Sequence, residues 1–272
     1  MTGRPEAPEV AWFAALCDDD YEYLGVPDPA LASSWEHCRD IVMAAEESGF
    51  DAVLLPSGYT LGIDSVAFAA GIATWTKRIR LLLAVRMGEM VLPQLARQLA
   101  TIDQMAAGRL LINIVSSDVP GETLPSEARY QRTLEYMQVL RDLLDRRPVR
   151  LDGQWVHLDI DPPRAATVSA TCPPLYFGGF SDAARDCGAA GADVYLMWPD
   201  TPDKVAGVVA DVSARADKLG RRLRFGWRSH VIVGETEAEA RAEAARLLSR
   251  LDPDVGSAIR ARSLDTASAG VK

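Results

Sequence analysis

Arg228 and His230 are the residues of this chain whose types and spacing most directly suggest chemistry. They lie two positions apart in the apolar stretch 225–233, which predicts a strand, so both side chains should share one face. The outer face of a barrel strand packs against apolar helices, so the pair should point inward, near the mouth where barrel active sites lie. There Arg228 could bind an anion, and its charge would favour a neutral His230 that acts as donor, acceptor or base. An ion-paired arginine beside a structurally hydrogen-bonded histidine is the alternative.

A second candidate is the turn 178–181, which reads Gly-Gly-Phe-Ser. The apolar run 175–177 before it predicts a buried strand, and Ser181 is placed to cap the Ala-rich helix that follows. Paired glycines let the backbone approach a ligand closely, and a helix N-terminus offers N–H donors to an anion. The turn therefore predicts an anion site, although a tight strand-to-helix turn without a ligand would have the same sequence.

Further candidates fall at the carboxyl ends of other predicted strands, where they could line a flat aromatic cofactor or merely pack at the rim. These residues are Met87, Ser116, Ser117 and Trp198. Arg129 and Tyr130 begin a predicted helix close to where a phosphate over the glycine turn would lie. Tyr130 also continues the apolar stripe of that helix, so core packing is an equal alternative.

Motifs of hydrolases and metalloenzymes do not occur in this sequence: it contains no H-E-x-x-H, G-x-S-x-G or P-loop, and no metal site is expected. The four cysteines have no zinc spacing and are too sparse for a disulfide framework, which predicts reduced thiols and a cytoplasmic protein. His37 is expected to be exposed on a helix, and His157 to be a solvated residue of a hairpin.

Composition sets wide limits on the partners of the chain. A net charge of −9 over 272 residues argues against a nucleic-acid or anionic-membrane surface. No apolar run approaches the roughly 20 residues of a membrane span. Residues 1–10 are polar, with two prolines, and do not read as a signal peptide.

Seven strand-then-helix units in series predict a parallel sheet covered by helices, and the length favours a TIM (β/α)8-type barrel. The predicted strands are 10–16, 52–55, 79–85, 110–115, 175–177, 194–198 and 225–233. The predicted helix caps are Ser33, Asp64, Ser126, Ser181 and Thr236. An open doubly wound sheet is the alternative fold. It typically carries G-x-G-x-x-G after the first strand, whereas this chain has Cys-Asp-Asp-Asp at 17–20, which disfavours it.

The chain is expected to form a single barrel domain, 1–272, with two irregular parts. Asp152-Gly153 between alternating segments predicts a hairpin at 149–160, within an insertion at about 146–172. The polar tail 252–272 holds no strand, so the eighth strand–helix unit of the barrel is missing. We therefore expect a gap between the last and first strands, or a partner chain that fills it.

Five segments resemble the flavin-dependent alkanesulfonate monooxygenases of the bacterial luciferase-like family, in order and spacing from about residue 10 to 251. They are GRLLINIV at 108–115, ARY at 128–130, PPLYFGG at 173–179, DVYLMW at 193–198 and FGWRSHVIV at 225–233. The resemblance implies two-component chemistry, in which a separate NAD(P)H-dependent reductase supplies reduced FMN. Oxygen then adds to give a flavin C4a-peroxide that attacks a small organic substrate, possibly a sulfonate.

The resemblance also assigns roles to residues. Arg228 and His230 match the family's catalytic pair. The residues that match its FMN phosphate site are Tyr130, Gly179, Phe180 and Ser181; Arg129, Met87 and Ser116 complete the expected cofactor contacts. The expected substrate contacts are Cys17, Tyr59 and Trp198. A homo-oligomer is also expected.

Departures from the family pattern leave alternatives open. Cys17 stands where the alkanesulfonate enzymes have an active-site histidine, the loop 57–64 lacks their cysteine, and Ser-Ser-Asp at 116–118 replaces Thr-Gly-Gly. Some relatives use the deazaflavin F420, whose longer anionic tail needs extra cations at the mouth. The loops offer chiefly Arg86 and Arg129, which favours FMN. A non-catalytic or truncated relative is the third possibility.

Overall fold

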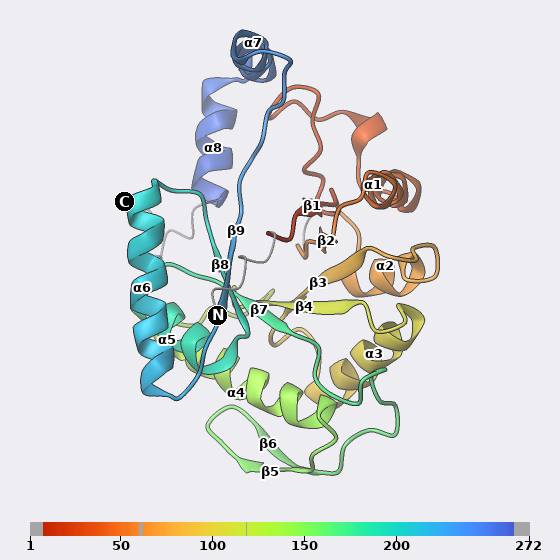
Figure 1. The fold of residues 1–272 in the computed structure, drawn as a ribbon, viewed down its shortest axis with the longest axis vertical. Coiled ribbons are helices and arrows are strands. Elements are labelled where there is room, and N and C mark those ends of the chain that lie inside the picture. Colours follow the sequence, from red (N-terminus) through yellow and green to blue (C-terminus); the bar gives the residue numbers. More distant parts are fainter. Residues whose placement is uncertain (1–7, 60–61, 118, 264–272) are drawn as a thin grey trace, which may run out of the picture.

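One curved sheet of parallel strands, covered on its outer side by helices, forms the body of the protein (Figure 1). It is seen in a computed structural model that describes residues 8–59, 62–117 and 119–263. In their order across the sheet the strands are β1 (Ala11–Phe13), β2 (Ala52–Leu55), β3 (Arg80–Arg86), β4 (Leu110–Val115), β7 (Leu175–Phe177), β8 (Val194–Met197) and β9 (Arg224–Trp227). The helices are α1 (Trp35–Glu47), α2 (Ser65–Ile72), α3 (Leu92–Met105), α4 (Ser126–Leu144), α5 (Asp182–Gly191), α6 (Pro202–Lys218), α7 (Glu237–Leu248) and α8 (Pro253–Ser263), with a short 3-10 helix at Pro29–Leu31.

The architecture confirms the predicted barrel type with an open side. Each strand pairs in parallel with the next, and helices α1 to α6 follow the outside of the sheet in chain order (Figure 1). Strands β1 and β9 are the two ends of the strand order, and no strand of the described chain joins them. The polar tail 252–272 is predicted to hold no strand. Its residues 253–263 form helix α8, and residues 264–272 lie outside the described residues.

Alternation along the strands creates two apolar layers. Outward-facing side chains such as Val53, Leu83 and Ile112 are fully buried with the apolar stripes of the helices, in the larger cluster. Inward-facing side chains such as Leu82 and Leu111 form a smaller cluster on the concave side. Burying a large aliphatic side chain stabilises a fold by roughly 1.5–3 kcal/mol, so the outer layer supplies most of the hydrophobic free energy.

Side-chain and loop contacts, rather than strand pairing, link the two ends of the sheet. Glu9 precedes β1 and pairs with Arg80 at 2.9 Å and with Arg224 of β9 at 3.7 Å. The N–H of Leu24 donates to the carbonyl of Leu247 in α7 at 2.8 Å. The open side is therefore spanned by an ion pair and by a tether from the β1–α1 loop to α7.

The predicted hairpin is present as β5 (Val149–Asp152) and β6 (His157–Ile160), paired antiparallel. Its connection is fixed from α4: the Glu135 carboxylate accepts the N–H groups of Gln154, Trp155 and Val156 at 2.9–3.1 Å. His157 is exposed, as predicted, and lies 2.6 Å from Asp152. Glu135 thus holds the tip of the hairpin, while Asp103 of α3 accepts the Val168 N–H at 2.8 Å later in the insertion.

Several local predictions hold. Asp64 and Ser181 cap α2 and α5 by accepting N–H groups three residues ahead. Thr236 and Glu239 form a complete capping box at the start of α7. These positions match because a side-chain oxygen just before a helix satisfies an N–H that has no partner within the helix.

Other local predictions are wrong. Ser34, not Ser33, caps α1, because the Ser33 hydroxyl donates to the Ala15 carbonyl and accepts from the Asp18 N–H. Ser126 lies inside α4, whose N-cap is Pro125, with no side-chain cap.

The first and last strands are shorter than predicted, because each has a neighbour on one side only. β1 ends at Phe13 and β9 at Trp227. Past Trp227 the backbone makes one more bond toward β8, from the Arg228 N–H to the Met197 carbonyl at 2.9 Å, and then leaves the sheet. Residues 231–233 are exposed rather than paired.

Candidate active site at the carboxyl ends of the strands

Arg228 lies between two aromatic rings just after β9. Its guanidinium carbon is 4.8 Å from the ring centroid of Phe13, the last residue of β1, and 4.6 Å from that of Trp198, just after β8. Among the described residues, no carboxylate lies within ion-pair distance of this guanidinium, and it donates no side-chain hydrogen bond. Burial lowers the pKa of Arg228, with Asp19 acting in the opposite direction. The cation is thus held by ring faces, and its N–H groups remain available for an anion.

The aromatic contacts continue from Arg228 to the glycine turn. The Trp198 ring is stacked on Phe180, with centroids 6.4 Å apart and an interplanar angle of 21°. Phe180 follows Gly179 directly and precedes Ser181, the cap of α5. The structure therefore brings two of the predicted groups, the Arg228 region and the glycine turn, into one continuous surface.

The two glycines are required by close approach. A Cβ at Gly178 would lie 2.2 Å from the Leu196 carbonyl oxygen, and one at Gly179 would lie 2.5 Å from the Cβ of Ala184. The Gly179 carbonyl accepts a hydrogen bond from the Tyr195 hydroxyl at 2.7 Å. Any side chain here would push α5 or β8 away, so both glycines are required for the turn to pack between these two elements.

The position of Tyr130 fits both alternatives drawn from the sequence, core packing and a phosphate contact. Its ring packs edge-on against Phe177, with centroids 6.1 Å apart, while its hydroxyl lies 3.4 Å from where a Gly179 Cβ would be. The Arg129 guanidinium carbon is 5.5 Å from the Tyr130 ring centroid, and Arg129 is only 3% exposed. Core packing and a phosphate contact are therefore compatible at Tyr130.

Other predicted cofactor contacts lie at the rim or beneath it. The Ser116 hydroxyl lies 2.7 Å from the Thr133 hydroxyl, which in turn donates to the Arg129 carbonyl at 2.9 Å. Met87 is 1% exposed and belongs to the core, which leaves it little surface for a ligand. The Ser117 hydroxyl bonds the Arg86 guanidinium, and Arg86 also pairs with Glu89 at 2.9 Å.

Cys17 and Asp19 form the acidic side of the mouth, after β1. Burial, and next the charge of Asp19, raises the pKa of Cys17 to about 11. Asp19 is exposed as a whole residue, yet desolvation of its carboxylate raises its pKa, which Arg228 partly counteracts. Cys17 is therefore a neutral thiol at physiological pH.

Two predicted site positions, His230 and Tyr59, do not lie in this group, and His37 differs from its predicted exposure. His230 is exposed and makes no side-chain contact with Arg228, because the chain has left the sheet before it. Tyr59 is 72% exposed at the tip of the β2–α2 loop, beside residues 60–61, which lie outside the described residues. His37, expected to be exposed, is half-buried and lies 2.9 Å from Asp20.

Sequence reasoning missed Phe13 and Asp19. Phe13 carries no signal beyond that of an apolar strand residue. The acidic run at 18–20 was used only as a strand break, although three carboxylates at the end of a first barrel strand could have indicated the mouth. Phe13 is not recognisable without knowing that β1 lies across from β9.

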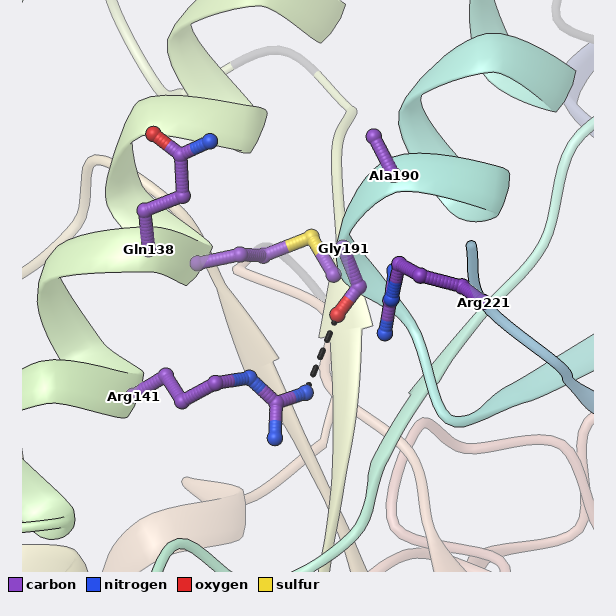
Figure 2. A pocket seen from close by; sticks show the side chains of 6 residues that line it. Gln138, Arg141, Ala190, Gly191 and Arg221 are labelled. Atoms are coloured by element: carbon purple, nitrogen blue, oxygen red, sulfur yellow. Dashed lines mark hydrogen bonds between the residues drawn. The ribbon is translucent and has the colours of Figure 1, made fainter. Parts of the chain in front are cut away.

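A cavity of about 240 Å³ lies at the opposite, amino end of the strands, between α4 and the end of α5 (Figure 2). Two guanidiniums point into it. Arg141 donates to the Gly191 carbonyl at 3.1 Å and pairs with Asp193 at 2.9 Å. Arg221 donates to the carbonyls of Ala189 and Ala192 at 2.9 and 2.7 Å. Here both cations are bound to the last turn of α5.

Neither a metal-binding cluster nor a membrane-spanning helix is present among the described residues. No group of three or more histidine, cysteine or acidic side chains is placed to hold a metal ion. None of the helices in this part of the chain has the length and apolarity needed to cross a membrane.

Comparison with sequences supports the resemblance drawn above. The family model described as luciferase-like monooxygenase matches residues 12–269. A sulfoquinovose monooxygenase of Novosphingobium aromaticivorans is 57% identical over 271 residues, which cover 97% of this chain and 75% of the relative. One of Agrobacterium fabrum is 47% identical over 270 residues, covering 98% and 70%.

Comparison with solved structures supports the fold. A riboflavin lyase matches with a TM-score of 0.83 at 17% identity, covering 95% of this chain and 71% of that one. The EDTA monooxygenase of Chelativorans sp. BNC1 matches with a TM-score of 0.79 at 16% identity, covering 96% and 74%. The coenzyme F420-dependent tetrahydromethanopterin reductase of Methanopyrus kandleri matches with a TM-score of 0.71 at 17% identity, covering 95% and 77%.

Proposed function

Because the chain belongs to the luciferase-like monooxygenase family, as a flavin-dependent monooxygenase, we propose that it oxygenates sulfoquinovose or a closely related sulfonated sugar. Reduced FMN would be supplied by a separate NAD(P)H-dependent flavin reductase. The names of the two similar proteins from Novosphingobium and Agrobacterium support this substrate class.

The observation that carries the proposal is the state of Arg228. A sulfonate is a permanent anion with three acceptor oxygens, and guanidinium N–H groups form strong charge-assisted hydrogen bonds with such groups. Arg228 lies at the carboxyl ends of the strands with rings on its faces and, among the described residues, without a carboxylate partner. An anionic substrate group would complete its hydrogen bonding.

The glycine turn fits a flavin phosphate. Gly179 lets the turn pass close to Ala184 at the start of α5, and the Tyr130 hydroxyl lies beside this turn, 3.4 Å from where a Gly179 Cβ would be. Arg129 lies under the Tyr130 ring and adds positive charge. The negative charge of Asp182 in the first turn of α5 is offset by Arg215 at 2.7 Å. Tyr130, Gly179, Phe180 and Ser181 would hold the phosphate end.

Bound reduced FMN would supply two electrons and the site for oxygen activation. One oxygen atom would be inserted into a C–H bond of the carbon that carries the sulfonate, and the other would leave as water, reduced by the two electrons of the flavin. The resulting hydroxysulfonate is the bisulfite adduct of an aldehyde and dissociates to aldehyde and sulfite. In this scheme Arg228 holds the sulfonate, and Trp198 and Phe180 shield the reacting centre from water. His230 stays a candidate proton donor or acceptor.

The direct test is sulfite release. The purified chain would be mixed with a flavin reductase, NADH, FMN, oxygen and sulfoquinovose, and sulfite would be measured with a thiol-disulfide reagent. We expect sulfite in proportion to substrate and none when the chain or the reductase is left out. Absence of sulfite with the sugar and with simple alkanesulfonates, from a chain that binds reduced FMN, would refute the proposal.

The cofactor is tested separately. Anaerobic titration with reduced FMN, followed in parallel with reduced F420, compares the two cofactors that proteins of this fold use. We expect tighter binding of FMN, with the loss of its binding in Gly179→Val, where added bulk meets Ala184. Tighter binding of F420 would overturn the choice of FMN.

A further inference from the structure

At the mouth, Phe13 and Arg228 are in contact across the open side of the sheet. Phe13 ends β1 and Arg228 follows β9, and these strands are the two ends of the strand order. The guanidinium carbon lies 4.8 Å from the Phe13 ring centroid and 4.6 Å from that of Trp198. Two strands that share no hydrogen bond thus meet through this side-chain pair.

The backbone fixes the start of the Arg228 side chain but not its end. The Arg228 N–H is bound to the Met197 carbonyl, the last bond of the strand ladder. Beyond that, an arginine side chain has several rotatable bonds, and ordering it costs up to about 2 kcal/mol. Within the described chain its orientation depends on the rings alone, because no side-chain acceptor holds it.

The two rings are supported differently. Trp198 is stacked on Phe180, which belongs to the turn before α5. Phe13 pairs through its backbone with Leu54 of β2 and belongs to the opposite end of the sheet. Losing the Phe13 ring would leave the guanidinium with Trp198 as its one ring contact, free to move toward the open side and toward Asp19, which interacts with it electrostatically.

We infer that Phe13 is a positioning residue for substrate binding: its ring, together with that of Trp198, orients the Arg228 guanidinium toward the anionic group of the substrate. The inference rests on the proposed function for the identity of that group, a sulfonate. It gives the end of β1 a role that the sequence alone did not indicate.

The first measurement does not depend on activity. The Arg228 Nε–H resonance, identified by its loss in Arg228→Lys, should lie upfield because the ring currents of Phe13 and Trp198 shield it. Phe13→Leu should move it downfield, and Phe13→Tyr should leave it in place. Trp12→Leu is the matched control, because the neighbouring Trp12 ring contacts Phe50 at 5.0 Å instead.

The second measurement is calorimetric titration with sulfoquinovose. Removing one of two cation–π contacts should weaken binding by about ten-fold in Phe13→Leu. Phe13→Tyr and Trp12→Leu should stay within about two-fold of wild type, as should FMN binding in all variants. If Phe13→Leu fails to fold, Phe13→Met serves in its place, since it fills similar volume without a ring face.

The outcomes distinguish the positioning role of Phe13 from the proposed sulfonate substrate. An unshifted Arg228 resonance in Phe13→Leu, or equal sugar affinity in Phe13→Leu and wild type, overturns the positioning role. An equal loss of affinity in Trp12→Leu does so too, because it would show a general effect of disturbing β1. A wild-type chain that binds no sulfonate removes the proposed substrate, and the resonance then decides whether Phe13 orients Arg228.

Discussion

Arginines at the two ends of the sheet have opposite surroundings. At the amino ends of the strands, Arg141 and Arg221 donate to carbonyls of the last turn of α5 and lie close to Asp193 (Figure 2). At the carboxyl ends, Arg228 is in contact with two rings and, within the described chain, with no acceptor for its side-chain N–H groups.

The difference teaches how to distinguish an arginine that holds the fold from one that awaits a ligand. Cations at a helix C-terminus satisfy carbonyls that would otherwise lack partners and interact favourably with the helix dipole. Asp193 also accepts the Leu175 N–H at 2.8 Å, so the amino-end cluster joins α4, α5, β7 and β8. Ring faces, in contrast, hold a guanidinium without using its hydrogen-bonding capacity.

The largest effect is expected from Arg228→Met. Removing a charge-assisted hydrogen-bond donor should lower kcat/KM for the sulfonated sugar by several hundred-fold, roughly 3–4 kcal/mol. The melting temperature should change little, because no described acceptor loses its partner. Steady-state sulfite release and a thermal melt measure the two quantities; a large loss of stability with retained activity would place Arg228 with the structural arginines.

Cys17 tests whether burial and Asp19, rather than the nearby arginines, control the end of β1. Its pKa of about 11, against an ordinary value near 9, means that the folded protein favours the thiol, and the thiolate forms only as pH rises toward 11. Alkylation by iodoacetamide at pH 8 should therefore be about 100-fold slower than for an unperturbed thiol.

Mass spectrometry of the peptide that contains Cys17 follows this reaction, with the denatured chain as reference. The rate should rise about ten-fold per pH unit between pH 8 and 10. Rapid alkylation at pH 7 would mean that positive charge, rather than burial and Asp19, dominates at the end of β1.

Arg141→Met tests the other side of the comparison. It leaves a Gly191 carbonyl and one oxygen of Asp193 without this donor, which should lower the free energy of unfolding by about 2–3 kcal/mol. Denaturant unfolding measures it, with Arg147→Met as the control, since the exposed Arg147–Asp142 pair should contribute less than about 1 kcal/mol. Sugar affinity should stay at the wild-type value; a selective loss of affinity would contradict the assignment.

The smallest effect is expected from Asp19→Asn. Removing a carboxylate whose charge reaches Arg228 should strengthen sulfonate binding by about two- to three-fold. Since the pKa of Asp19 is raised, lowering the pH toward 5 should protonate this carboxyl before an ordinary one, and wild-type binding should tighten. Titration calorimetry at pH 5 and 7 should show this tightening in wild type and not in Asp19→Asn.

Much of the fold could be predicted because it depends on local patterns. Apolar runs, cap residues such as Asp64 and Ser181, and the Asp152-Gly153 turn each determine a short segment. The series of units then leaves few ways to arrange a parallel sheet. The open side followed from counting strands.

The site could be predicted only in part because it depends on which segments meet in space. Period-two spacing placed His230 beside Arg228, but β9 ends at Trp227 because it has too few backbone partners to continue. Phe13 came into the site because the sheet curves until β1 faces β9, which no local pattern encodes. The glycine turn was found in advance because its chemistry lies in consecutive residues.

The tether between Leu24 and Leu247 has a consequence for how the molecule assembles. These residues lie near the two ends of the described chain, yet the N–H of one is bound to the carbonyl of the other. A contact so distant in sequence pays a large loop-closure entropy unless everything between it has already folded. We therefore expect closure of the open side to be the last event in folding and the first to reverse, and the amide of Leu24 should exchange its hydrogen with solvent before those of β3 and β4.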